Sequence, residues 1–160
     1  MRVARAVPAT NAEGPFLRYA LWVQGCGLRC PGCCNPEMLD VNGGEPRHVD
    51  AIVDEIRCAR REHGIEGISV LGGEPLEQIA AVTALAEAAS ADGLGVIVFT
   101  GHTDAEARAL PGFARLWRAI GQHRGCGMNR CRIGRSQVDG HKHQHKRQIQ
   151  RNNGCVAVCV

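Results

Sequence analysis

Short apolar segments alternate with amphipathic segments along the first two thirds of the chain. Residues 17–23, 68–71 and 96–99 are short runs rich in apolar side chains, which is typical of buried strands. Between them, residues 49–63 and 79–92 carry apolar side chains at helical spacing, and a glycine follows each pattern closely. The pattern therefore predicts the order strand, helix, strand, helix, strand.

A further short helix is predicted after the third strand, because Thr103 precedes Glu106 by three residues in the manner of a capping box. Strands that alternate with helices predict an α/β fold with a parallel sheet and right-handed crossovers. Ligands bind such sheets at the carboxyl ends of the strands. Two unusual segments are expected at that edge: the cysteine loop, residues 25–34, and the glycine loop, residues 72–75.

The pattern ends near Gly121, and we expect a core domain at residues 1–121 and a separate tail at residues 122–160. Residues 1–118 hold 11 Lys and Arg against 15 Asp and Glu, whereas residues 119–160 hold 8 against 1. The tail is basic and rich in Cys and His, and only VAVCV at its end has the pattern of a strand. A solvated tail explains this charge more simply than a nucleic-acid partner does.

No apolar run approaches the roughly 20 residues that a membrane helix needs, and the first ten residues lack the apolar segment of a secretory signal. The expected location is the cytoplasm, with no membrane contact. Nine cysteines in that compartment favour metal binding or catalysis over disulfides.

Cys26, Cys30 and Cys33 form a CxxxCxxC motif within eight residues. Three thiolates at this spacing can bind three irons of a cubane cluster and leave the fourth iron open for a substrate or cosubstrate. A zinc site with Cys34 as the fourth ligand is the alternative, but adjacent cysteines rarely both reach one metal. We expect Cys34 to lie beside the cluster and Cys58 to be a small core residue.

Paired glycines in the glycine loop allow a close approach to the backbone, and Glu74 supplies an acceptor for a ligand ammonium group. The plainer interpretation is a tight turn with a surface glutamate. The tail has its own metal hypothesis, for which adventitious binding is the favoured account. Its candidate ligands are Cys126, Cys131, His141, His143, His145, Cys155 and Cys159.

Together, the cysteine loop and the glycine loop resemble the radical S-adenosylmethionine superfamily, and most closely the activating enzymes of anaerobic ribonucleotide reductase. The resemblance covers roughly residues 13–110. It includes Glu13-Gly14-Pro15 and Arg18, Gly25 to Cys33 with Asn35, ISVLGGEPL at residues 68–76, and Phe99-Thr100-Gly101-His102.

This resemblance implies a partial (β/α) barrel-like sheet, altered at the C-terminus, that binds a [4Fe-4S] cluster and S-adenosylmethionine. Cys26, Cys30 and Cys33 would hold the cluster, the backbone of Gly32 to Cys34 would lie against S-adenosylmethionine, and Glu74 with Gly72 and Gly73 would receive its amino group. Reductive cleavage would give a 5′-deoxyadenosyl radical that installs a glycyl radical on a partner. The implied partners are a glycyl radical enzyme such as anaerobic ribonucleotide reductase and a flavodoxin- or ferredoxin-type electron donor.

The chain departs from the family pattern at three loop positions and in the tail. Gly32 replaces the aromatic residue of the wider superfamily, while Cys34 and His102 stand where the activating branch commonly has tyrosine. The tail offers only Val138-Asp139-Gly140 in place of the family's last strand and turn, so the resemblance bears on ancestry more than on activity. Two alternatives remain: a radical enzyme for a small molecule or peptide, such as a deazapurine synthase, and a non-enzymatic metal- or nucleic-acid-binding module.

Overall fold

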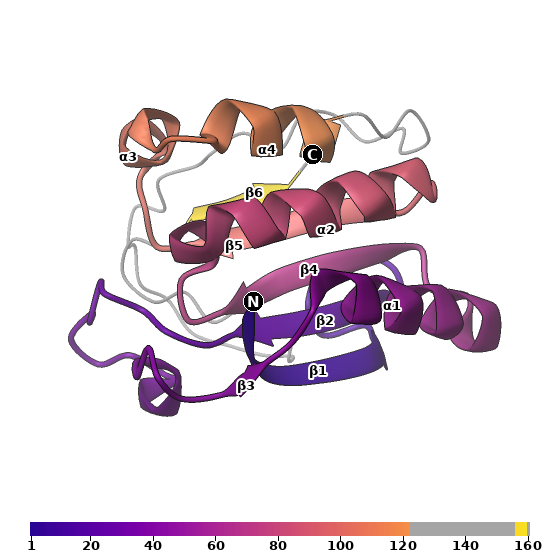
Figure 1. The fold of residues 1–160 in the computed structure, drawn as a ribbon, viewed down its shortest axis with the longest axis horizontal. Helices are drawn as coiled ribbons and strands as arrows, with labels where there is room; N and C mark the ends of the chain where they lie inside the picture. Colours follow the sequence, from indigo (N-terminus) through magenta and orange to yellow (C-terminus); the bar gives the residue numbers. More distant parts are fainter. Residues whose placement is uncertain (122–155, 160) are drawn as a thin grey trace, which may run out of the picture.

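A computed structural model describes residues 1–121 and the strand at residues 156–159 (Figure 1). In chain order the elements are β1 (Arg2–Thr10), β2 (Arg18–Val23), the 3-10 turn η1 (Pro36–Met38), β3 (Glu45–Pro46), α1 (Val49–His63), β4 (Gly67–Gly72), the 3-10 turn η2 (Pro75–Gln78), α2 (Ile79–Ala91), β5 (Gly95–Thr100), α3 (Asp104–Ala109), α4 (Phe113–Gly121) and β6 (Val156–Cys159).

The strands form one open sheet in the order β3-β1-β2-β4-β5-β6. The central strands β2, β4 and β5 are parallel to one another, as the alternation of strands and helices predicts. Val23 pairs with Gly72, so β2 and β4 end together and their following loops leave the sheet side by side. The predicted α/β class is confirmed, and the sheet as a whole is mixed.

The predicted helices and central strands are present close to their expected bounds. Helix α1 is capped by Gly64, which directly follows it and adopts the left-handed conformation with φ 68° that a glycine tolerates without strain. Helix α3 begins with the expected capping box, in which Thr103 and Glu106 exchange hydrogen bonds with each other's backbone.

Strand β1 is not predicted by the apolar pattern, because Arg2, Arg5 and Pro8 interrupt it. Its pairing with β2 is antiparallel, and the register shifts between Val3 and Arg5 and again between Val7 and Thr10. Pro8 lies within the second irregular stretch, where a strand tolerates a missing N–H group. Tertiary pairing with β2 therefore determines this strand. Helix α4 was also not predicted from the sequence. The VAVCV segment, which has the pattern of a strand, contains β6, and this strand pairs antiparallel with β5.

Helices α1 and α2 lie across one face of the sheet, and α4 lies beside α2 (Figure 1). The apolar core lies between these helices and the strands, with Leu21, Ile52, Ile68, Leu85 and Leu116 among its most buried members. Burial of such side chains contributes about 1.5–3 kcal/mol each, which is what fixes the helices on the sheet.

Arg18 stabilises the sheet at the amino ends of its central strands, opposite the cysteine loop and the glycine loop. Its side chain is 3% exposed; it donates to the carbonyls of Ile68 and Gly95 at 2.6 and 2.9 Å and to the Ser69 hydroxyl at 2.8 Å. The Ser69 hydroxyl in turn donates to the Glu13 carbonyl at 2.6 Å. The Glu13 and Arg18 positions of the family resemblance thus act in the scaffold, far from the carboxyl edge.

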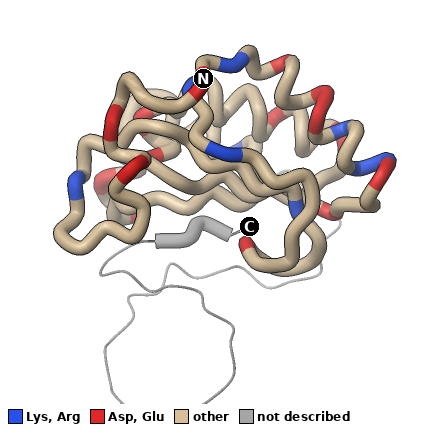
Figure 2. Tube along the Cα trace, turned by 90° about the horizontal axis from the view of Figure 1, so that it is seen from below, with Lys and Arg blue, Asp and Glu red and all other residues tan. Residues whose placement is uncertain are grey.

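Charged residues of both signs are interleaved along the described part of the chain (Figure 2). No helix within the described residues is long and apolar enough to cross a membrane.

Candidate functional site

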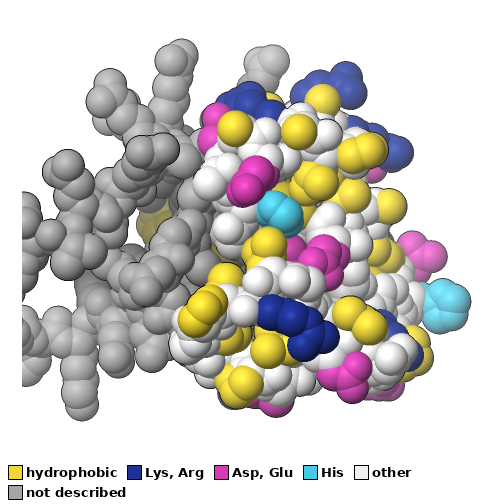
Figure 3. Space-filling view, turned by 90° about the vertical axis from the view of Figure 1, so that its left-hand side faces the viewer, with side chains coloured by type: hydrophobic (Ala, Val, Ile, Leu, Met, Phe, Trp, Pro, Cys, Tyr) yellow, Lys and Arg dark blue, Asp and Glu magenta, His cyan; other side chains and the backbone are white. Residues whose placement is uncertain are grey.

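The cysteine loop follows β2 and belongs to a longer connection that extends beyond the ends of the strands, to the left in Figure 1. Hydrophobic, acidic and basic side chains gather together on this side of the molecule (Figure 3). Residues 27–32 are all exposed. The loop is therefore anchored at the sheet and open at its tip.

Backbone hydrogen bonds fix the start of the cysteine loop. The Gly25 N–H donates to the Met38 carbonyl at 2.9 Å, and the Cys26 N–H donates to the Leu39 carbonyl at 3.4 Å. Met38 is itself buried, so it anchors this crossing against the core. The backbone at the first cysteine is therefore held against a segment 13 residues further along the chain.

The Gln24 side chain links the start of this connection to its later part. It is 6% exposed, and its amide nitrogen donates to the carbonyls of Glu37 and Asp40 at 3.1 and 2.8 Å. A buried amide that satisfies two carbonyls stabilises a loop that has few apolar contacts of its own. The sequence analysis missed Gln24, although a polar residue directly after a buried strand was a usable signal.

The paired glycines let the glycine loop contact the backbone of the cysteine loop. A Cβ atom on Gly73 would lie 2.2 Å from the Gly25 carbonyl oxygen, and one on Gly72 would lie 2.8 Å from the Trp22 Cα. Gly72 also has φ 103°, which L side chains rarely adopt. The Gly73 N–H donates to the Val23 carbonyl at 2.8 Å. The close approach that these glycines permit is therefore made, at least in part, by the protein's own backbone.

Glu74 is a buried carboxylate that joins the two loops to the end of β5. It is 1% exposed; Oε1 accepts from the Leu76 N–H and the Thr100 hydroxyl, both at 2.8 Å, and Oε2 accepts from the Gly101 N–H at 2.9 Å. The Glu74 N–H donates to the Gly25 carbonyl at 2.8 Å. The plainer expectation of a surface glutamate is wrong. The predicted contact with a ligand ammonium stays a prediction.

The four cysteines of the loop are all free thiols, with Cys26 and Cys33 half-buried and Cys30 and Cys34 exposed. A tight turn links Cys30 to Cys33, whose N–H donates to the Cys30 carbonyl at 3.2 Å. Gly32, within this turn, has φ 72°, and a Cβ there would meet no atom within 4 Å. Among the described residues, no three Cys, His, Asp or Glu side chains converge on a point where a single metal ion could bind.

The donor set nevertheless fits a [4Fe-4S] cluster in its chemistry. Three thiols on one loop are the ligands that iron–sulfur clusters use, and the exposed residues 27–32 can rearrange without disrupting the core. Burial raises the pKa of the Cys26 thiol and the carboxylates of Glu77 and Glu74 raise it further, while the N–H groups of Leu28 and Arg29 act in the opposite direction. A metal that binds Cys26 has to displace this proton.

Glu77 and Thr100 also belong to this site, and the sequence analysis gave neither of them a role. The Glu77 carboxylate accepts from the Gly27 N–H at 2.7 Å. Thr100 lies in the segment that carries the family resemblance, but no sequence signal pairs it with Glu74. His102 is half-buried, and its N–H donates to the Thr100 hydroxyl at 3.2 Å.

Cys58 corrects an expectation, because it is not a core residue. It lies half-buried on α1, and its thiol donates to the Glu62 carboxylate at 3.2 Å. The proposed tail ligands and the Val138-Asp139-Gly140 segment lie outside the described residues; for Cys159 only the backbone, in β6, is described.

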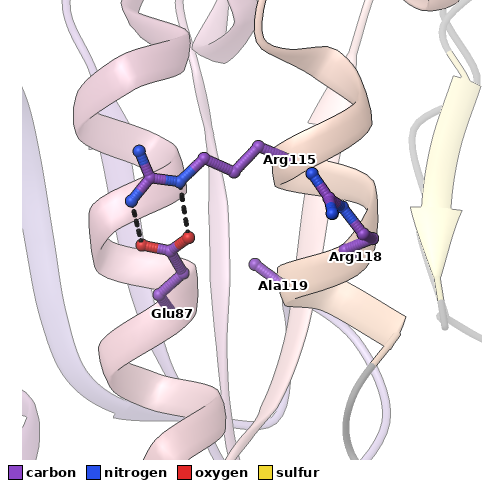
Figure 4. Close-up of a pocket in the computed structure, with 4 residues that line it drawn as sticks. All are labelled: Glu87, Arg115, Arg118 and Ala119. Carbon is purple, nitrogen blue, oxygen red and sulfur yellow. Dashed lines mark hydrogen bonds and ion pairs between the residues drawn. The ribbon is translucent and has the colours of Figure 1, made fainter.

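A pocket between α2 and α4 is lined by Glu87, Arg115, Arg118 and Ala119 (Figure 4). Arg115 forms two hydrogen bonds with the Glu87 carboxylate, at 2.7 and 2.8 Å, across it. Glu87 lies more than two helical turns along α2 from the glycine loop. This pocket belongs to the helix packing and is separate from the cysteine loop.

Comparison with known proteins places both loops in one family. The family described as "4Fe-4S single cluster domain" matches residues 12–116, which include the cysteine loop, the glycine loop and the end of β5.

Three curated relatives show how the likeness is distributed. The anaerobic ribonucleoside-triphosphate reductase-activating protein of Salmonella typhi is 32% identical over 109 residues, covering 64% of this chain and 70% of that protein. The pyruvate formate-lyase-activating enzyme of Staphylococcus epidermidis is 39% identical over 95 residues, covering 56% and 37%. The 7-carboxy-7-deazaguanine synthase of Hyperthermus butylicus is 35% identical over 124 residues, covering 74% and 48%. The chain therefore spans less than two thirds of two of these relatives.

Proposed function

Because this chain belongs to the family of 4Fe-4S single cluster domains of the radical S-adenosylmethionine type, we propose that it activates a glycyl radical enzyme, with anaerobic ribonucleotide reductase as the partner. The observation that carries the proposal is the joining of the cysteine loop to the glycine loop at the carboxyl edge of the sheet, through Gly25 and Glu74. This pair of loops lies wholly within the residues that the family matches.

In this proposal Cys26, Cys30 and Cys33 would hold the cluster and leave it one position open to S-adenosylmethionine. The backbone of Gly32 to Cys34, together with Gly72, Gly73 and Glu74, forms the cofactor site. When bound, a cluster would supply the one electron needed to cleave S-adenosylmethionine into methionine and a 5′-deoxyadenosyl radical, which would take a hydrogen atom from the partner.

The protein contributes a rigid edge and an open loop to this chemistry. The hydrogen bonds of Glu74 and Gln24 fix the edge, while the exposed residues 27–32 leave the site accessible to a large partner. The relative with the greatest coverage of its own length among the three is a reductase-activating protein, which supports this partner over pyruvate formate-lyase.

A small-molecule reaction is the second candidate function, since the deazaguanine synthase matches a larger share of this chain than the two activating proteins do.

Anaerobic incubation of the reconstituted protein with S-adenosylmethionine, a reductant and either candidate glycyl radical enzyme distinguishes activation of such an enzyme from a small-molecule reaction. We expect a glycyl radical signal by electron paramagnetic resonance on the reductase. Release of 5′-deoxyadenosine without a radical on either enzyme would contradict the proposed partner and leave the core chemistry standing.

A further inference from the structure

Glu77 is an exposed glutamate directly beside the glycine loop, and its side chain crosses to the cysteine loop. Its carboxylate accepts from the Gly27 N–H at 2.7 Å, a short distance for this kind of bond. A Cβ on Gly27 would lie 2.8 Å from the same oxygen, so the contact depends on a glycine there. Neither residue has a role among the proposed cluster ligands.

The position of Glu77 is set by Glu74. The Glu74 carboxylate caps the turn η2 by accepting from the Leu76 N–H, and the Glu77 N–H donates to the Glu74 carbonyl at 3.1 Å. One carboxylate therefore points inward and orders the turn, while the other, three residues later, points outward and reaches the loop. Glu74 thus orders the turn η2 from the core side, and Glu77 on that turn contacts the cysteine loop.

With the contact between Glu77 and Gly27, the short segment at residues 25–27 is held by hydrogen bonds along its whole length. The N–H groups of Gly25, Cys26 and Gly27 and the carbonyl of Gly25 all have partners outside the cysteine loop. By contrast, the backbone bond found at Cys30 and Cys33 is the one they form with each other. The loop thus has a fixed first cysteine and an exposed turn that carries the other two.

We propose that Glu77 is a positioning residue that holds the backbone beside Cys26 in place, so that the cysteine loop retains a bound cluster. The inference rests on the proposed function of the three cysteines. It assigns Glu77 no contact with iron or with S-adenosylmethionine. Its effect passes through the Gly27 N–H, so an uncharged acceptor at the same position should serve.

Variants of the full chain separate this role from a general effect of charge. Glu77→Gln keeps an acceptor oxygen, whereas Glu77→Ala removes it. Glu37→Gln is the matched control, because Glu37 is an exposed acid in the same connection and its side chain forms no hydrogen bond with the described residues. Two measurements are needed: hydrogen exchange at the Gly27 amide before reconstitution, and the rate of iron loss to a chelator afterwards.

We expect Glu77→Ala to lose protection at the Gly27 amide and to release iron about three- to tenfold faster, because a single exposed hydrogen bond is lost. Glu77→Gln and Glu37→Gln should both stay within about twofold of the wild type. Iron release from Glu77→Gln as fast as from Glu77→Ala would show a charge effect and overturn the proposal, as would unchanged release from Glu77→Ala. A wild-type chain that binds no cluster would instead overturn the proposed function, while the exchange measurement would still report the contact.

Discussion

Glu74 is the residue on which the two loops and the end of β5 depend together. A carboxylate offers about four acceptor positions, and three neutral donors occupy three of them. One position on Oε2 is left for a ligand ammonium, which would have to reach a side chain that is 1% exposed. The residue is therefore important to the stability of the site whatever else it binds.

Glu74→Ala should lower the free energy of unfolding by about 2–4 kcal/mol, because the Leu76 N–H and the Thr100 hydroxyl are left buried without an acceptor. Urea unfolding of the cluster-free protein under anaerobic conditions measures this. Glu66→Ala is the control, since Glu66 is exposed, and should change stability by less than about 0.5 kcal/mol. Equal stability of the two variants would contradict the structural role.

In cluster-loaded protein, the same Glu74→Ala variant should bind S-adenosylmethionine about ten- to a hundredfold more weakly if the carboxylate meets the cofactor ammonium. Calorimetric or spectroscopic titration of the loaded protein gives the Kd, and iron content checks that loss of the cluster is not the cause. A Kd equal to that of the wild type would leave Glu74 with the structural role alone.

The cysteines and Glu74 can be proposed as site residues from the sequence because their spacing and glycine neighbours are local signals. It could not pair Glu74 with Thr100 or Glu77 with Gly27, since these contacts join positions 26 and 50 residues apart. Such partners follow from the register of parallel strands, which a single sequence does not display.

At the scale of elements, α1 is tied to the sheet by a polar contact as well as by its apolar face. The Tyr19 hydroxyl on β2 donates to the Glu55 carboxylate on α1 at 2.8 Å, and Arg47 pairs with the same carboxylate. Burial by itself raises the pKa of Glu55, but the hydrogen bonds from Arg47 and Tyr19 outweigh it and leave the pKa below its ordinary value of 4.5.

Tyr19→Phe should lower the free energy of unfolding by about 1 kcal/mol at neutral pH. A carboxyl group whose pKa is lowered on folding stabilises the protein above its unfolded pKa and loses that contribution as the pH falls through the folded pKa. The difference between wild type and Tyr19→Phe should therefore shrink as the pH falls below about 4.5. Chemical unfolding at several pH values tests this, and a difference that stays constant from neutral to acidic pH would contradict it.

The elements that the sequence predicted share one property: their patterns are local. Helix α1 shows apolar side chains at helical spacing, and strands β4 and β5 are short apolar runs next to glycines. Each of these elements can therefore be predicted from its own segment of the sequence. Strand β1 gains its conformation from pairing with β2, and its arginines and proline conceal it. Helix α4 is short and directly follows a turn, so its apolar spacing extends over too few residues to predict a helix from the sequence.

At the scale of the whole molecule, the sheet is open, and β6 pairs with the outer edge of β5. All proposed ligands lie between Cys26 and Glu74, whereas this edge strand is supplied by the far end of the chain. The division into a core at residues 1–121 and a tail at residues 122–160 stays a prediction. The proposed ligands and the strand that covers the edge of β5 thus lie in different parts of the chain.

Deleting residues 122–160 should leave iron bound per chain close to the wild-type value and should promote self-association, because β5 loses its partner and presents unpaired backbone groups. Anaerobic gel filtration with iron quantification gives both quantities. A truncated chain that assembles no cluster would contradict the core boundary, and one that remains monomeric would show that β6 is not needed to protect the edge.

Reductive formation of 5′-deoxyadenosine is the direct test of whether Cys26, Cys30 and Cys33 bind a cluster that cleaves S-adenosylmethionine. Each of the three should be changed to serine, with Cys34→Ser as the neighbouring control and Cys58→Ser as the control on α1, and all chains reconstituted anaerobically with iron and sulfide. We expect 5′-deoxyadenosine and a [4Fe-4S] signal in the wild type and both controls, and loss of both in the three variants. Full activity in Cys30→Ser, or equal loss in Cys34→Ser, would contradict this expectation.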